Sequence, residues 1–155
     1  MMSVGFKHSA LLRGMARAAL FSTALFSASL PAATSAGELP RTVAPEGAEV
    51  YFITPADGET VSSPVVVRFG LRGLGVAPAG VQAPNTGHHH LAVNRDLPAL
   101  DQPIPTDILH FGGGQTETTL ELEPGEHTLQ LILGDYLHIP HDPVVKSEVI
   151  AITVE

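Results

Sequence analysis

The stretch TETTLELEPGEHTLQLIL, residues 116–133, decides the fold class of this chain. Its first part, up to Leu122, alternates threonine or leucine with polar residues, and its second part, from His127, places leucine at every second position. A period of two predicts β-strands, and the Pro124-Gly125 pair between them predicts a turn. Because no segment shows the sustained 3.6-residue apolar period of an amphipathic helix, we predict an all-β protein.

Five further segments have the β-branched and apolar composition of strands, and short turn-rich stretches separate them. They are residues 50–53, 65–71, 88–94, 108–111 and 147–154. About seven strands in one domain predict a two-sheet antiparallel sandwich of immunoglobulin-like type, with an eight-stranded barrel as the alternative. In such a sandwich the third strand pairs with the sixth, so residues 88–94 are expected to lie antiparallel to residues 127–133.

The N-terminal residues predict export. Basic residues precede an uncharged apolar run at residues 18–30, and small residues follow up to Ala36. We therefore predict a cleavable signal peptide at 1–36, a tether at 37–49 and a β-sandwich domain at 50–155, located in the periplasm. The run is too short to span a bilayer comfortably, so no membrane span is expected after cleavage, although an uncleaved anchor is the alternative.

Composition restricts the partners of the exported part. It holds all 16 acidic residues of the chain but only five basic ones, which leaves a net charge of −11 with histidine neutral. An acidic surface repels phosphate backbones, so a nucleic acid is not expected as a partner. The chain has no cysteine, so a metal site must use imidazole and carboxylate groups.

The exported part is rich in histidine, with seven of the eight in the chain. His88 and His90 stand two apart on a predicted strand and therefore share a face, whereas His89 points to the core face with Leu91. Antiparallel pairing with residues 127–133 brings that strand's start close to the loop at residues 134–143.

The residues that this pairing gathers are the candidate metal ligands. They are His88, His90, His138 and His141, with Asp135 or His110 as a fifth ligand or as a partner that orients an imidazole. Imidazole-rich sites suit Zn²⁺ or Cu²⁺ and suit Ca²⁺ poorly.

Three functions are compatible with this pattern. The first is a periplasmic domain that binds zinc or copper for metal handling rather than catalysis, although an open ligand position would permit an enzyme. The second is a non-catalytic module that binds an envelope protein through its long loops, with structural histidines. The third is a pH sensor built on clustered imidazoles. A serine hydrolase and a phosphate-binding loop lack their motifs, and Gly112-Gly113-Gly114 is expected to form a tight bend where side chains would clash.

Four runs resemble a known family of exported bacterial domains of unknown function. They are NTGHHHL (85–91), LDQPIP (100–105), LHFGGGQTETTLEL (109–122) and PGEHTLQLILGDYLHIPHDP (124–143). The resemblance covers about residues 50–154 and implies a small periplasmic β-domain. Some members carry a rod-shape-determining label, which these residues do not support. The family supplies no activity and no ligand residues.

Overall fold

The computed structural model describes residues 39–155, and these residues contain nine strands and no helix. The predicted signal peptide lies outside the described residues. The strands are β1 (Glu49–Thr54), β2 (Thr60–Val61), β3 (Val65–Arg72), β4 (Gly75–Val76), β5 (Thr86–Val93), β6 (Leu109–His110), β7 (Glu117–Leu120), β8 (Gly125–Gly134) and β9 (Ile150–Val154).

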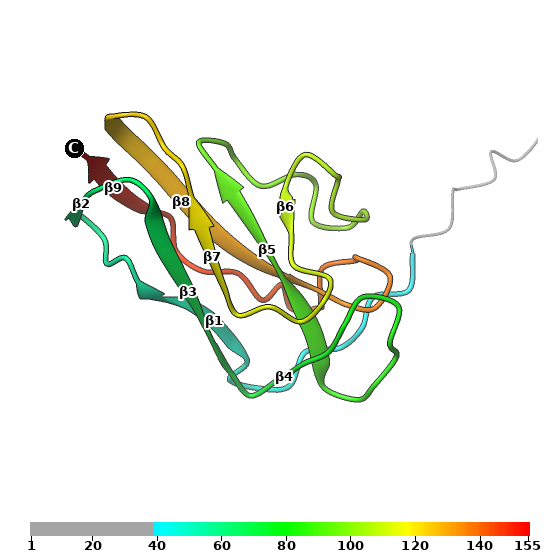
Figure 1. The fold of residues 1–155 in the computed structure, drawn as a ribbon. Coiled ribbons are helices and arrows are strands. Elements are labelled where there is room, and N and C mark those ends of the chain that lie inside the picture. The colour runs from blue at the N-terminus through cyan, green and yellow to red at the C-terminus, as the bar shows by residue number, and fades with distance from the viewer. Residues whose placement is uncertain (1–38) are drawn as a thin grey trace, which may run out of the picture. The chain divides into compact units, whose positions relative to one another are not determined.

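The strands form two sheets that do not close on each other, as the prediction of a sandwich requires (Figure 1). One sheet has the order β1-β3-β7, and the other has the order β2-β9-β8-β5-β4, with β6 also paired to β5. The count exceeds the predicted seven because β2 and β4 are two-residue strands in segments expected to be turns or loops. These two strands join their neighbours in parallel, while the longer pairs are antiparallel.

The main core lies between the sheets. Alternation along β8 sends Leu129, Leu131 and Leu133 into it, where they are fully buried together with Val67 of β3 and Leu91 of β5. Burying one such side chain contributes about 1.5–3 kcal/mol to folding. The sequence pattern therefore predicted this face of β8 correctly.

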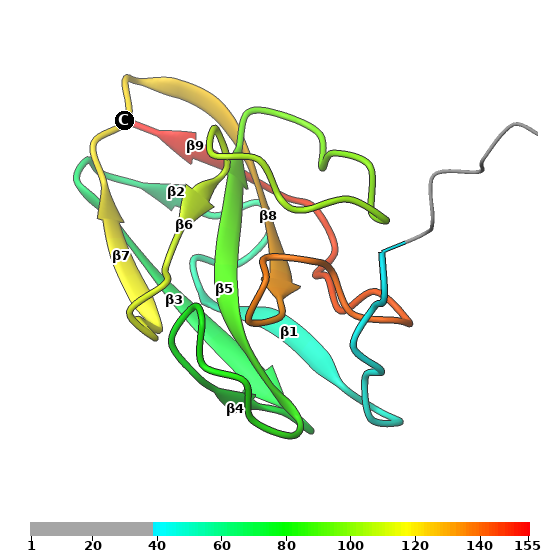
Figure 2. The ribbon, with the colours of Figure 1, turned by 90° about the vertical axis from the view of Figure 1, so that its right-hand side faces the viewer.

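The outer face of the larger sheet is also covered. A second apolar cluster forms there from Ala92 of β5, Ile132 of β8, and Ile104 and Ile108 of the loop before β6. Figure 2 shows that loop and the segment after β8 lying in front of β5 and β8. This layer buries a face that a two-sheet sandwich would otherwise leave to solvent.

The predicted pairing of the third and sixth strands is confirmed as the β5–β8 pair. His88 lies opposite Gly134 and His90 opposite Ile132, in antiparallel register. On its other edge β5 pairs with β6, and His90 lies directly opposite His110.

The predicted tether at 37–49 is partly built into the described fold. Its residues Val43 and Ala44 run alongside Asp142: the Ala44 amide donates to the Asp142 carbonyl at 2.9 Å, and Val43 forms a bridge there. Arg41 donates hydrogen bonds to the carbonyls of Pro140 and His141. This stretch therefore supports the loop that follows β8.

Candidate metal centre

Four histidines converge on the outer face of the larger sheet: His88, His90, His110 and His138. Each offers a ring nitrogen, and the four nitrogens lie within 4.8 Å of one another. The sheet accounts for three of them, because His88 and His90 share a face of β5 and His110 is the cross-strand neighbour of His90. His138 comes from the loop after β8.

The four rings lie close to the corners of a tetrahedron. Their six centroid separations are 4.7, 4.7, 4.9, 5.0, 5.1 and 5.9 Å. A tetrahedral ion with metal–nitrogen bonds of about 2.0–2.1 Å would hold the centroids about 5.2 Å apart. A square-planar ion would place the ring centroids of both trans pairs about 6.3 Å apart. Here the longest separation is 5.9 Å, and the separation between the other two rings is only 5.0 Å. The arrangement thus fits a tetrahedral ion better.

The ring nitrogens of His110 and His138 already have the spacing of neighbouring ligands. Their Nε2 atoms lie 3.1 Å apart, and tetrahedral ligands at about 2.0–2.1 Å from an ion would be about 3.3 Å apart. To reach that spacing, other ring nitrogens must approach by up to roughly 1.5 Å, so binding an ion requires the rings to reorient.

His88 and His90 have buried rings without hydrogen-bond partners. Both residues are about 1% exposed, and among the described residues neither Nδ1 nor Nε2 of either ring meets a partner. An unpaired buried polar group costs about 1–3 kcal/mol, so such groups call for an explanation. A bound ion would satisfy one nitrogen of each ring.

Burial also sets the protonation of these rings. Loss of solvent, followed by repulsion from His138 and His110, lowers the pKa of His88 to about 4, although Asp135 opposes this. Burial, followed by repulsion from His88, lowers the pKa of His90 to about 3. The pKa of the exposed His110 is lowered for the same two kinds of reason. At neutral pH these imidazoles are uncharged, the form that binds metals.

Two glycines make room for the rings. A Cβ built on Gly134 would lie 2.8 Å from Cε1 of His90, and one built on Gly112 would collide with the ring of His110. The triple glycine therefore serves close approach at Gly112, as expected, and a left-handed bend at Gly114, whose φ is +83°.

Asp135 does not join the cluster as a ligand. Its buried carboxylate accepts hydrogen bonds from the amides of Leu137 and Ile139 at 2.9 and 3.0 Å, and from the Thr42 hydroxyl at 2.7 Å. These bonds fold the loop so that His138 adopts a left-handed conformation with φ 66°. Asp135 therefore holds the loop through two amides and a hydroxyl, which is neither of the two roles predicted for it, a fifth ligand or a partner that orients an imidazole.

His141 also lies outside the four-histidine group. Its ring is fully buried, and Nε2 lies 3.2 Å from the carbonyl oxygen of Thr86, to which it can donate. It ties the loop to the start of β5. His89 points to the other side of the sheet, as predicted, with its ring centroid 5.1 Å from that of Phe69.

Sequence reasoning missed the N-terminal contribution to the site. Arg41 and Thr42 fasten the loop that carries His138, but no motif marks them, and their stretch has the composition of a linker. The close approach of Gly134 to His90 was also missed. The sequence does hold a signal for this approach: Gly134 directly follows the strand predicted at residues 127–133, and in the antiparallel pairing it lies opposite His88.

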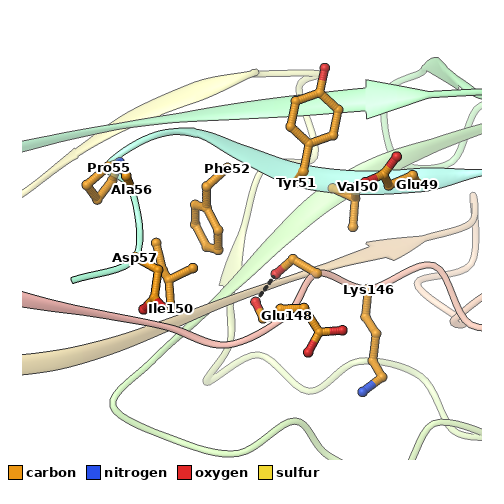
Figure 3. A pocket seen from close by; sticks show the side chains of 11 residues that line it. Glu49, Val50, Tyr51, Phe52, Pro55, Ala56, Asp57, Lys146, Glu148 and Ile150 are labelled. Atoms are coloured by element: carbon orange, nitrogen blue, oxygen red, sulfur yellow. Dashed lines mark hydrogen bonds between the residues drawn. The ribbon is translucent and has the colours of Figure 1, made fainter. Parts of the chain in front are cut away.

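A groove of about 340 Å³ lies elsewhere, between β1 and residues 146–150 (Figure 3). Three of its polar side chains already have partners. The Asp57 carboxylate accepts the Ala151 amide at 2.9 Å, Glu49 pairs with Arg72, and the Ser147 hydroxyl donates to the Glu148 carbonyl. Because the histidine cluster gathers four metal-ligating groups, it is a stronger candidate site than this groove.

Comparison with known proteins places the chain in a family. Residues 67–155 match Domain of unknown function (DUF4399). The chain belongs to this family. The match runs from within β3 to the end of β9 and so includes all four clustered histidines. No curated protein and no solved structure matched the chain. Within the described residues, no helix has the length and apolarity needed to cross a membrane.

Proposed function

We propose that this DUF4399 protein binds one transition-metal ion, zinc or copper, through His88, His90, His110 and His138, and that it handles metal in the periplasm after export. The observation that carries the proposal is the tetrahedral arrangement of the four rings, two of which are buried with unpaired nitrogens. An alternative purely structural role would leave those nitrogens uncompensated.

The geometry supports zinc as the first candidate. Zinc takes nitrogen ligands in a tetrahedron, whereas copper(II) prefers a tetragonal arrangement. The neutral state of the buried rings removes the proton competition that weakens histidine sites. Metal handling is preferred to catalysis because four protein ligands complete a tetrahedral shell.

Titration of the purified, untagged protein with Zn²⁺ and with Cu²⁺, followed by calorimetry and elemental analysis, tests the proposal. We expect one ion per chain and a Tm that rises with metal and falls with chelator. His88→Ala and His138→Ala should each weaken binding at least a hundredfold. His127→Ala is the matched control, because His127 bonds Asn94 and Glu123 away from the cluster. Equal binding by wild type and His88→Ala would refute the assignment.

Export is tested separately. Periplasmic extraction of cells that make the full chain should release a product that N-terminal sequencing places near Gly37. Retention of the unprocessed chain with the membrane would contradict this part of the proposal.

A further inference from the structure

A pocket of about 200 Å³ borders the proposed metal centre. It is lined by His90, His110 and His138 together with Ile104, Pro105 and Thr106 of the loop before β6. Three of the four proposed ligands thus share one wall of this pocket, and they define one triangular face of the ring tetrahedron. The fourth, His88, does not line it.

The widest gap between rings borders this face. The longest of the six ring separations, 5.9 Å, joins His90 and His138, and it is an edge of this triangle. The edges that meet at His88 are all 5.0 Å or shorter. Since this gap also borders the His88–His90–His138 face, it is the pocket, which His88 does not line, that selects the His90–His110–His138 face.

We propose that this pocket is the site of an exogenous metal ligand, a small anionic Lewis base with a single donor atom, which reaches the ion across the His90–His110–His138 face. The proposal rests on the proposed metal site. Zinc in catalytic sites can expand from four to five ligands, and the proposal requires the same expansion here for an incoming donor.

The chemistry of the walls defines the class of ligand. A divalent ion held by four neutral imidazoles keeps its two positive charges, which favours an anion over a neutral donor. Asp135, the buried carboxylate nearest in sequence to His138, is already held by two amides and a hydroxyl, so it does not supply the anionic donor. Ile104 and Pro105 provide apolar surface for the end of the ligand away from the metal, and Thr106 lines the pocket from an exposed position.

The test uses Co²⁺ in place of Zn²⁺, because its visible spectrum reports the number and geometry of its ligands, and azide as the probe anion. We expect azide to change the spectrum of the Co²⁺-loaded protein saturably. Thr106→Phe, which fills the pocket from an exposed position without altering a ligand, should keep the Co²⁺ spectrum and bind azide at least tenfold more weakly. Thr106→Ala is the matched control: it changes the same residue without filling the pocket, and because no hydrogen bond from Thr106 is part of the proposal, it should bind azide like the wild type.

The outcomes separate the two proposals. A normal Co²⁺ spectrum that does not respond to azide, or an equal response in Thr106→Phe and wild type, would overturn the ligand pocket and leave the metal site standing. Absence of any Co²⁺ spectrum from the four-histidine protein would overturn both. Circular dichroism of each variant ensures that a lost response reflects the pocket rather than unfolding.

Discussion

The metal-free protein should lose most of its stability between pH 6.5 and pH 4. The responsible groups are His88, His89 and His90, which are at most 1% exposed and have pKa values lowered to about 4, 4 and 3, chiefly by burial. Their pKa values in the unfolded chain are about 6.5. Because each pKa is lower in the folded state, the unfolded chain binds more protons below pH 6.5, and acid favours unfolding.

The size of the effect follows from proton counting. One extra proton bound by the unfolded chain changes the free energy of unfolding by about 1.4 kcal/mol per pH unit. Three histidines therefore give a slope of about 4 kcal/mol per pH unit near pH 5, and about 5 kcal/mol is lost between pH 6.5 and pH 5. Since domains are stable by only about 5–15 kcal/mol, this loss brings the protein close to unfolding.

Urea unfolding at pH 7.5, 6.0 and 5.0 in the presence of chelator, followed by circular dichroism, measures this slope. His89→Leu removes one of the three titrating groups and leaves the metal cluster intact, because His89 lies in the core against Phe69 and outside that cluster. The slope of this variant should fall by about a third, and its stability at pH 7.5 should stay equal to or above that of the wild type because two unpaired buried nitrogens are removed. Unfolding free energies that agree within about 1 kcal/mol between pH 7.5 and pH 5.0 would refute the reasoning.

Three further changes test how the site is built. Gly134→Ala places a methyl group 2.8 Å from the His90 ring, so calorimetry should show metal binding weakened about 10- to 100-fold in a folded protein; unchanged affinity would mean that the ring moves freely. Asp135→Ala leaves the Leu137 and Ile139 amides without an acceptor and should cost about 2–5 kcal/mol in urea unfolding; a cost under about 1 kcal/mol would deny Asp135 its role in the loop. His127→Ala removes a link between β8 and Asn94 and should lower stability by about 1 kcal/mol in the same assay, without changing metal affinity.

The fold could be predicted from the sequence where one face of a strand is buried. The leucines of β8 recur at every second position, so both the strand and its core face were predictable. The β5–β8 pairing followed from the expected sandwich order and is confirmed. The two-residue strands β2 and β4 were not predictable, since two residues carry no period and their pairing depends on neighbours distant in the sequence.

The candidate site was predictable in part, for a reason that particular residues make clear. The spacing of His88 and His90 fixes their common face locally, and strand pairing brings in His138 from the next loop. Whether His110 or His141 completes the group depends on loop packing: β6 pairs with β5 and presents His110, whereas His141 turns toward the carbonyl of Thr86. No local pattern distinguishes these two histidines.

The spacing of the four clustered histidines along the chain has a consequence for folding in a protein without cysteine. His90, His110 and His138 are separated by about 20 residues and by 28 residues, so a shared ion would close two long chain loops at once. A covalent cross-link over a 15-residue loop restricts the unfolded chain enough to contribute about 3 kcal/mol. The ion would act as a reversible cross-link in place of disulfides, one that forms without an oxidant and that a chelator can remove.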